Sequence, residues 1–453
     1  RRLAVKRKRN WNWSRVKSML PGTRRGWLTA LAAGLPLTFG GGMVIAQRMN
    51  ATPPIGPFPQ RDLRGRVVVV TGGTSGIGRS TASRLVQRGA IVVIGSRDAA
   101  RGSATAKALE AAASNSGGVT GSVVVLPLDV SSPASTVAFA DAVSLLDEVA
   151  QRNGGGIDAL LLGAAEIPMD EGCTTDEGVD LAFATNHLGA HTLLTMLEPA
   201  LRRGGQRERG RNSRVVVISS RLENHAVPSL DELESSAGAR FVALREAKPK
   251  DVAAGDSNVD DTKPAKFDPM LTYAATKRCN MALVLERHAR WSKEGTPIEI
   301  VAVTPGMVNT DLWRHYSKWF RALTSPVRAA FLRTAEDASE GVFFALAART
   351  LPTRPPVVLA SKRASKEERR AQAEAVLAAA KERKVDDAAR QKEEEKMKQR
   401  NNGNGNCFFG FRVPLLYLSD SVVIEPSEGS RDLKFAMRLS ELCDAIVLRT
   451  TGR

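Results

Sequence analysis

The sequence predicts an α/β fold in which a doubly wound parallel sheet is covered by helices on both faces. Short apolar runs alternate with helix-like stretches along most of the chain, and a glycine-rich loop follows the first of these runs. The apolar runs are continuous rather than alternating, which indicates strands buried on both faces. Parallel strands between two layers of helices meet that condition.

The predicted elements follow one another in the order that such a fold requires. The predicted strands are Val67–Val70, Ile91–Gly95, Val123–Leu128, Ile157–Leu162, Arg214–Ser219, Ile298–Thr304 and a last one at Leu415–Ser419. The predicted helices are Ile77–Arg88, Pro133–Gln151, Asp176–Leu201, Thr272–Trp291 and an amphipathic closing helix at Leu433–Leu448.

Two polar stretches interrupt this pattern. We expect one core domain at 63–351 and 413–453, with a surface insertion at 229–269. In the second stretch, 352–412, the segment 361–400 carries 13 basic and 9 acidic residues and precedes an Asn/Gly tether. This composition predicts a solvated helix or, alternatively, a docking helix for a protein partner.

The excess positive charge lies at the N-terminus. The net charge is +17, and the arm formed by residues 1–26 holds ten Lys and Arg but no acidic residue. A local basic arm is typical of targeting or of an anionic membrane surface. We therefore expect no nucleic-acid binding by the folded part, and the arm is a second candidate for a partner contact.

An uncharged segment follows the arm. Residues 27–47 belong to a run of 22 residues without a charge, and about 20 apolar residues span a bilayer core. We expect a membrane anchor there, joined by a linker at 48–62, with an interfacial or import segment and a disordered tail as alternatives. This predicts membrane association at the endoplasmic reticulum or at an organelle such as a mitochondrion or plastid.

The four cysteines show no metal-ligand spacing, which predicts a reducing compartment and no metal.

The glycine-rich loop after the first strand predicts a dinucleotide site. Glycines let the backbone approach a pyrophosphate, and the N-terminus of the next helix offers unpaired N–H groups and a positive dipole end. A tight turn without a ligand is the alternative. The candidate phosphate-binding residues are Gly72, Thr74, Ser75, Gly76, Ile77 and Gly78.

The end of the second strand indicates which dinucleotide binds. It reads Gly95-Ser96-Arg97 and lacks the carboxylate that would bind both ribose hydroxyls. Arg97 and Arg79 can instead neutralise a 2′-phosphate, which favours NADP(H) over NAD(H). Asp129, after the third strand, is a candidate acceptor for the adenine amino group or, alternatively, a turn residue.

Tyr273 and Lys277 are the candidate catalytic pair, because residues at i and i+4 share one face of a helix. Tyr273 can exchange a proton with a substrate oxygen during hydride transfer, provided that its pKa of roughly 10 is lowered. The charge of Lys277 would favour the phenolate, and its ammonium can bind the nicotinamide ribose. Ser220 can orient the substrate oxygen, and Asn186 can tie a water chain to Lys277.

Five segments together resemble the short-chain dehydrogenases/reductases. They are T-G-G-T-S-G-I-G at 71–78, T-N-H-L-G at 185–189, V-V-V-I-S-S at 215–220, Y-A-A-T-K-R-C-N at 273–280 and P-G-M-V-N-T at 305–310. The resemblance implies a Rossmann-type fold. It places the family's catalytic tetrad on Asn186, Ser220, Tyr273 and Lys277. It places the nicotinamide-side segment on Pro305, Gly306 and Thr310.

Within the family, the sequence is most similar to the retinol dehydrogenase and protochlorophyllide reductase branch, which mostly uses NADP(H) on hydrophobic substrates. Two departures stand out. Leu162-Gly163-Ala164-Ala165 replaces Asn-Asn-Ala-Gly, whose amides normally brace the sheet, and the insertion separates the serine from the tyrosine.

The aromatic segment 312–320 predicts an apolar lid or, alternatively, ordinary helix packing. His187 and His315 are interpreted as surface or packing residues.

We therefore expect a membrane-associated, NADP(H)-dependent oxidoreductase that interconverts a hydrophobic alcohol and its aldehyde or ketone. One alternative is a catalytically silent subunit of an organellar membrane complex, which the missing amides and the insertions suggest. Another is an enzyme that reduces a carbon–carbon double bond in a tetrapyrrole-like substrate.

Overall fold

The computed structural model describes residues 62–115, 119–150, 155–207, 211–245, 267–313, 332–348, 417–419, 422–424 and 432–453, with single positions between 319 and 328. All of them lie in the unit Thr52–Arg453. The basic arm, the expected anchor at 27–47 and the charged segment 361–400 lie outside the described residues. Of the helices that the structure describes, none combines the length and the apolar character needed to cross a bilayer.

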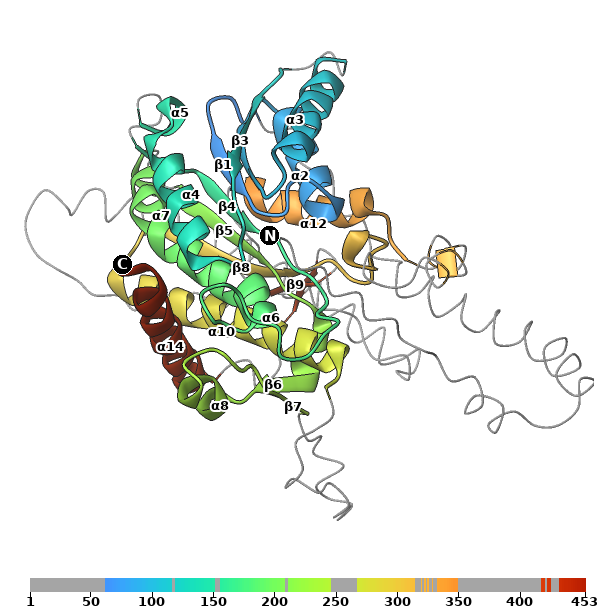
Figure 1. Ribbon diagram of the computed structural model, residues 1–453. Coiled ribbons are helices and arrows are strands. Elements are labelled where there is room, and N and C mark those ends of the chain that lie inside the picture. Colours follow the sequence, from blue (N-terminus) through green and yellow to red (C-terminus); the bar gives the residue numbers. More distant parts are fainter. Residues whose placement is uncertain are drawn as a thin grey trace, which may run out of the picture. The chain divides into compact units, whose positions relative to one another are not determined.

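A sheet with the strand order β10-β9-β8-β5-β4-β1-β2-β3 forms the core (Figure 1). Its strands are β1 (Val67–Val70), β2 (Ile91–Ser96), β3 (Ser122–Pro127), β4 (Ala159–Leu162), β5 (Ser213–Ile218), β8 (Ile298–Thr304), β9 (Tyr417–Ser419) and β10 (Val422–Ile424). All neighbours pair in parallel except β9 and β10. The strand order reverses between β1 and β4, and ligands bind at this switch point in doubly wound sheets.

Helices cover both faces of the sheet (Figure 1). One layer contains α2 (Gly76–Val86), α3 (Ala99–Ser114) and α12 (Ala335–Ala347). The other contains α4 (Pro133–Leu145), α7 (Gly189–Gln206) and α10 (Pro269–Glu294), with the short α5 (Asp147–Ala150) after α4. Outside that second layer, α14 (Leu433–Thr451) packs on α4, α7 and α10. The predicted parallel, doubly wound sheet is confirmed.

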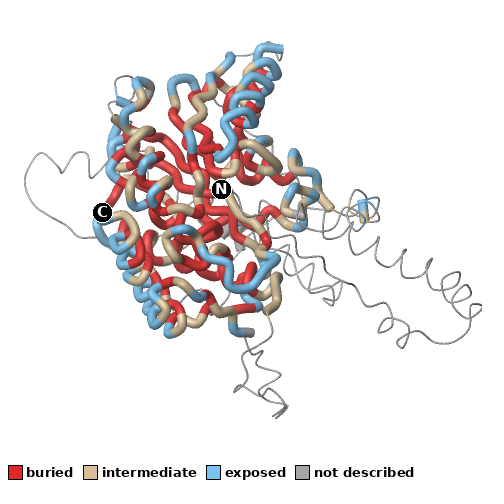
Figure 2. Tube along the Cα trace, viewed as in Figure 1, coloured by how far each residue is buried: buried red, intermediate tan, exposed pale blue. Residues whose placement is uncertain are grey.

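The central strands are buried (Figure 2), and each serves two hydrophobic cores. Val67 and Val69 of β1 pack with α4 and α7, whereas Val68 and Val70 pack with α2 and α12. Successive side chains of a strand point to opposite faces, so continuous valines fill both cores. This alternation explains why the strands could be predicted as uninterrupted apolar runs.

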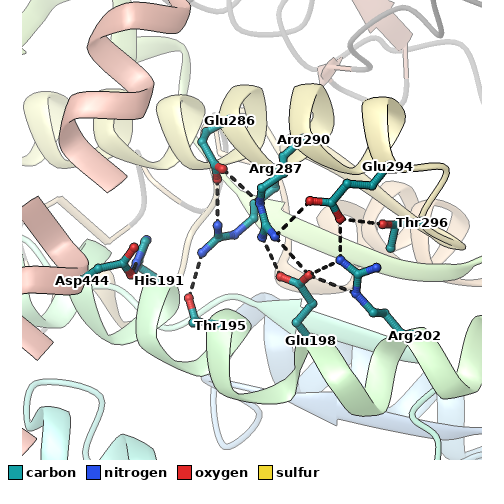
Figure 3. Close-up of polar contacts among 10 residues, drawn as sticks. All are labelled: His191, Thr195, Glu198, Arg202, Glu286, Arg287, Arg290, Glu294, Thr296 and Asp444. Atoms are coloured by element: carbon teal, nitrogen blue, oxygen red, sulfur yellow. Dashed lines mark hydrogen bonds and ion pairs between the residues drawn. The ribbon is translucent and has the colours of Figure 1, made fainter. Parts of the chain in front are cut away.

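An ion-pair network joins the outer helices (Figure 3). The Glu198 carboxylate on α7 accepts hydrogen bonds from Arg202, at 2.7 Å, and from Arg290 on α10, at 2.6 Å. His191 on α7 pairs with Asp444 on α14 at 2.7 Å. The network holds the C-terminal half of α10 against α7, whereas Tyr273 and Lys277 lie in the N-terminal half of the same helix.

Several helical regions differ from the prediction, and the helix expected at Pro133–Gln151 is divided at Leu146 into α4 and α5. Helices α3 and α12 were not predicted, because their buried faces use many small residues and give a weak apolar period. The single helix expected at Asp176–Leu201 is a turn followed by α6 (Leu181–Phe183), a π-helical turn at Ala184–Leu188 and α7.

The expectation of a wholly surface-lying insertion at 229–269 is wrong for its first part. After the 3-10 turn η4 (Arg221–His225), β6 (Ala226–Pro228) pairs with β7 (Ala243–Arg245), and α8 (Leu230–Ser235) lies between them. Leu230, Leu233 and Phe241 are buried in a third core, which includes residues of α10 and α14. These apolar residues are too few and too widely spaced to show in the sequence. Residues 246–266 lie outside the described residues.

Leu233→Ala tests whether the insertion is part of the core. Leu233 is fully buried, and emptying such a site costs about 2–5 kcal/mol of unfolding free energy. Urea unfolding of the variant should show this loss. Leu244→Ala, at a half-exposed position of the same insertion, should stay within about 0.5 kcal/mol of the parent. Equal small effects at both positions would contradict the buried arrangement.

Candidate active site

A cleft of about 310 Å³ opens where β1 and β4 end, at the switch point of the sheet. The expected cofactor residues that line it are Gly72, Thr74, Ser75, Gly76, Ile77, Gly78, Arg97, Tyr273, Lys277, Pro305, Gly306 and Thr310. Ser220 lines it as well. Arg79 and Asp129 are not part of this lining. The fold therefore brings one candidate proton donor, one ammonium and the glycine loop to a single cleft.

The glycine loop has the conformation of a phosphate cradle. Gly72 and Gly76 have positive φ angles of 70° and 49°, which side chains rarely adopt. A Cβ on Gly78 would lie 2.4 Å from the carbonyl oxygen of Gly72, so no larger residue fits there. The N-cap residue Ser75 makes no side-chain cap hydrogen bond to α2.

This uncapped end sets α2 apart from several other helices. Side chains accept hydrogen bonds from the first N–H groups of α3, α4, α10, α12 and α14. The N-terminal N–H groups of α2 face the cleft, and such groups with the helix dipole favour a phosphate. The donor set therefore fits the pyrophosphate of a dinucleotide.

The loop after β4 is braced without the family's two asparagines. Leu162, at the first Asn position, is buried among apolar side chains. The hydroxyl oxygen of Thr71 accepts hydrogen bonds from the N–H groups of Gly163, at 2.9 Å, and Ala164, at 3.2 Å. A Cβ on Gly72 would press on this loop at 3.1 Å. Apolar packing and one hydroxyl thus provide the brace.

Asn186 braces the same loop from the other side. Its side-chain oxygen accepts from the N–H of Glu166, and its amide donates to the carbonyl oxygen of Glu166, both at 2.8 Å. The amide also lies 3.2 Å from the hydroxyl of Thr276 on α10. The side chain therefore joins the loop to α10, and none of these hydrogen bonds goes to Lys277. A water-mediated link from Asn186 to Lys277 stays a prediction.

Tyr273, Lys277 and Ser220 converge on the cleft from α10 and from the end of β5. Lys277 is buried, and its Nζ donates to the carbonyl oxygen of Ile218 at 3.0 Å. This nitrogen lies 5.4 Å from the centroid of the Tyr273 ring. Ser220 is half-buried, and its hydroxyl accepts from the N–H of Leu222 at 3.3 Å. These three side chains, which the sequence predicts for catalysis, therefore line one cavity.

Burial, rather than the neighbouring charge, dominates the acid–base properties of this pair. Desolvation raises the pKa of the Tyr273 hydroxyl well above its usual value. The same effect lowers the pKa of Lys277 to about 8. Burial therefore opposes the expected lowering of the Tyr273 pKa by Lys277, and that lowering stays a prediction. A buried phenolate loses more hydration than an ammonium at this distance returns.

Two arginines line the cleft beyond the end of β2. They are Arg97 and Arg101, and Arg101 was not predicted because it lies in the first turn of α3, a helix that the sequence did not reveal. The carboxylate of Asp98 accepts from the N–H of Arg101 at 2.9 Å and so caps α3. Asp129 accepts from the N–H and the hydroxyl of Ser131, at 3.0 and 2.7 Å. This is a turn role, and contact with adenine stays a prediction.

A buried ion pair next to the site was also missed. Arg278, the residue after Lys277, lies 3.3 Å from the carboxylate of Glu223, in the turn after Ser220. Both side chains are buried, so the pair fixes this turn against α10.

His187 is a packing residue and not a surface residue, because it is buried and contacts Asn280 at 3.1 Å. Most of the expected lid, including 314–318, lies outside the described residues.

Comparison with known proteins places this site in a family. The short chain dehydrogenase model matches residues 66–236. Retinol dehydrogenase 14 of Mus musculus is 29% identical over 336 residues, which cover 70% of this chain and 86% of that protein. Polyprenol dehydrogenase of Mus musculus is 28% identical over 305 residues, covering 67% and 77%. The short-chain dehydrogenase/reductase pyiH of Pyricularia grisea is 30% identical over 250 residues, covering 54% and 91%.

The chain belongs to the short-chain dehydrogenase/reductase family. It is an oxidoreductase of the class that uses NAD(P)H. The two mouse relatives are named for retinol and polyprenol.

The buried ammonium predicts a characteristic pH dependence of stability. The pKa of Lys277 falls from 10.5 to about 8 on folding. Between these values the unfolded chain keeps a proton that the folded chain has lost, so this group makes stability rise with pH. Lys277→Met removes the effect. In urea unfolding, wild type should therefore gain stability relative to the variant between pH 7 and about 9.5. A difference that does not change with pH would contradict the burial of the charge.

Proposed function

We propose that this protein is an NADP(H)-dependent oxidoreductase that interconverts a hydrophobic alcohol and its aldehyde or ketone. The observation that carries the proposal is the shared cleft. Ser220, Tyr273 and Lys277 line the same cavity as the uncapped N-terminus of α2. A dinucleotide whose pyrophosphate rests on that terminus would supply or accept the hydride.

Each side chain has a defined task in this scheme. Ser220 holds the substrate oxygen, and Tyr273 donates its proton to that oxygen as the carbonyl is reduced. Burial keeps the phenol protonated at neutral pH, which suits the donor role. Lys277 binds the ribose hydroxyls and stabilises negative charge on the phenol oxygen. Asn186 keeps the loop after β4 in place at the edge of the cleft.

The substrate and the setting are inferred from two further observations. The relatives are named for retinol and polyprenol, which are both long apolar alcohols. The basic arm and the uncharged segment 27–47 have the composition of a membrane anchor. We therefore propose membrane association, at the endoplasmic reticulum or an organelle, where such substrates dissolve.

Tyr273→Phe tests the proposed proton donor. The change removes one oxygen and keeps the ring, so the fold and NADPH binding should persist. Turnover of a long-chain aldehyde should fall by about 10²- to 10⁴-fold, the usual contribution of general acid catalysis. Steady-state kinetics and calorimetric titration with NADPH measure the two effects. Undiminished turnover would remove Tyr273 from this role, and a wild type without saturable NADPH binding would favour a silent subunit.

Arg97→Ser tests the choice of cofactor. Arg97 lines the cleft beyond the end of β2, and a charge-assisted bond to a 2′-phosphate is worth about 1.5–3 kcal/mol. The dissociation constant for NADPH should therefore rise by roughly ten- to hundredfold, while that for NADH stays nearly constant. Lys107→Ser, on the exposed side of α3, controls for the lost positive charge. Equal effects on both cofactors would refute the role of Arg97 in discrimination.

A further inference from the structure

A second cavity, here called the side chamber, adjoins the cofactor cleft. Its volume is about 440 Å³, and Glu166 lines both cavities. Leu271 and Thr272 of α10 line the side chamber, and the next residue, Tyr273, lines the cleft. The two cavities are therefore neighbours at Glu166 and at the start of α10.

The walls of the side chamber combine an apolar patch with charged residues. They come from the loop after β4, the start of α6, the insertion and the start of α10. The apolar lining includes Ile167, Pro168, Met169, Leu181, Phe241 and Leu271. Small-molecule sites bind the apolar part of a ligand on side chains of this kind.

The insertion forms one wall and is fixed in place. The N–H of Asp180 donates to the carbonyl oxygen of Gly238 at 2.8 Å, and the Asp180 carboxylate accepts from the N–H groups of Phe183 and Phe241. The rings of Phe183 and Phe241 stack with centroids 5.3 Å apart. The wall formed by residues 239–243 is thus held against α6.

The ionisable residues of the side chamber are mostly acidic. The acidic members are Glu166, Asp170, Glu171, Asp180 and Asp268. The guanidinium of Arg240 lies 3.3 Å from Glu232, which offsets its charge. Like charges raise the free energy of a bound anion, so the chamber disfavours a substrate whose far end is a carboxylate. An uncharged tail meets no such repulsion, and the apolar side chains of the lining can contact it.

We propose that the side chamber binds the uncharged apolar tail of the substrate, and that insertion residues 239–243 set the tail length that the enzyme accepts. This inference rests on the proposed function and specifies its substrate class. Val242 is the residue of choice for a test, because it belongs to the insertion, lines the chamber and is half-buried.

The experiment measures kcat/KM of the full chain with NADPH and unbranched aldehydes of increasing length. For wild type we expect a rise of a few-fold per added methylene until the chamber is filled. Dodecanal should be preferred at least about tenfold over the aldehyde of the same length that ends in a carboxylate.

Two substitutions of Val242 should shift the length profile in opposite directions. Val242→Trp fills the chamber, so the preferred aldehyde becomes shorter, and Val242→Ala lengthens it. Leu244→Trp is the matched control, because this side chain is half-exposed and outside the chamber lining, and its profile should equal that of wild type. NADPH binding and thermal unfolding report whether each variant is folded.

The outcomes separate the two proposals. Turnover with a length profile that neither Val242 variant changes, or equal use of the carboxylated aldehyde, overturns the side-chamber inference and leaves the oxidoreductase proposal intact. Absence of turnover with every aldehyde counts against the proposed function. In that case calorimetric binding of dodecanol still decides the inference: weaker binding by Val242→Trp supports it, and unchanged binding overturns it.

Discussion

The buried contact between the N-terminal half of α10 and the carboxyl end of β5 is the constraint on which the site depends. Lys277 donates to the carbonyl oxygen of Ile218 across this contact, and the buried pair of Arg278 and Glu223 continues it to the turn after Ser220. The contact brings the side chains for proton transfer to the edge where the dinucleotide cradle ends. The contact buries the ammonium of Lys277 away from water, and this desolvation lowers its pKa. Such a loss of stability is typical of groups that are kept for activity.

The elements that could be predicted from the sequence are those whose signal is local. Valine runs predicted the strands, and the spacing of Tyr273 and Lys277 placed both on one helix face. The contacts that complete the site join residues far apart in the chain. Thr71 braces Gly163, and Asn186 braces Glu166. The pKa of Tyr273 depends on how deeply the side chain is buried in the folded protein, and the sequence pattern does not show that depth. The opposing effect of burial on this pKa could therefore not be predicted from the sequence.

The departures from the family pattern have local physical replacements in the described residues. At position 162, apolar packing of Leu162 replaces the hydrogen bonds of the family's asparagine amide. The hydroxyl of Thr71 accepts hydrogen bonds from the backbone N–H groups of the following loop. The insertion adds a third core and one wall of the side chamber, with Phe241 contributing to both. A loop that looks polar in the sequence thus stabilises the helix bearing Tyr273 and shapes the space beyond it. Substrate choice and the placement of α10 are consequently linked through the same segment.

The central claim is that the cleft holds a nicotinamide dinucleotide with its reactive ring beside Tyr273. A rapid-mixing single turnover tests it most directly, with the full chain, a stoichiometric amount of NADPH and excess dodecanal, followed by nicotinamide absorbance. The account predicts saturable NADPH binding and loss of the reduced absorbance in one exponential phase that depends on the phenol oxygen of Tyr273. Failure of NADPH to bind, or hydride transfer at the same rate without that oxygen, would contradict it.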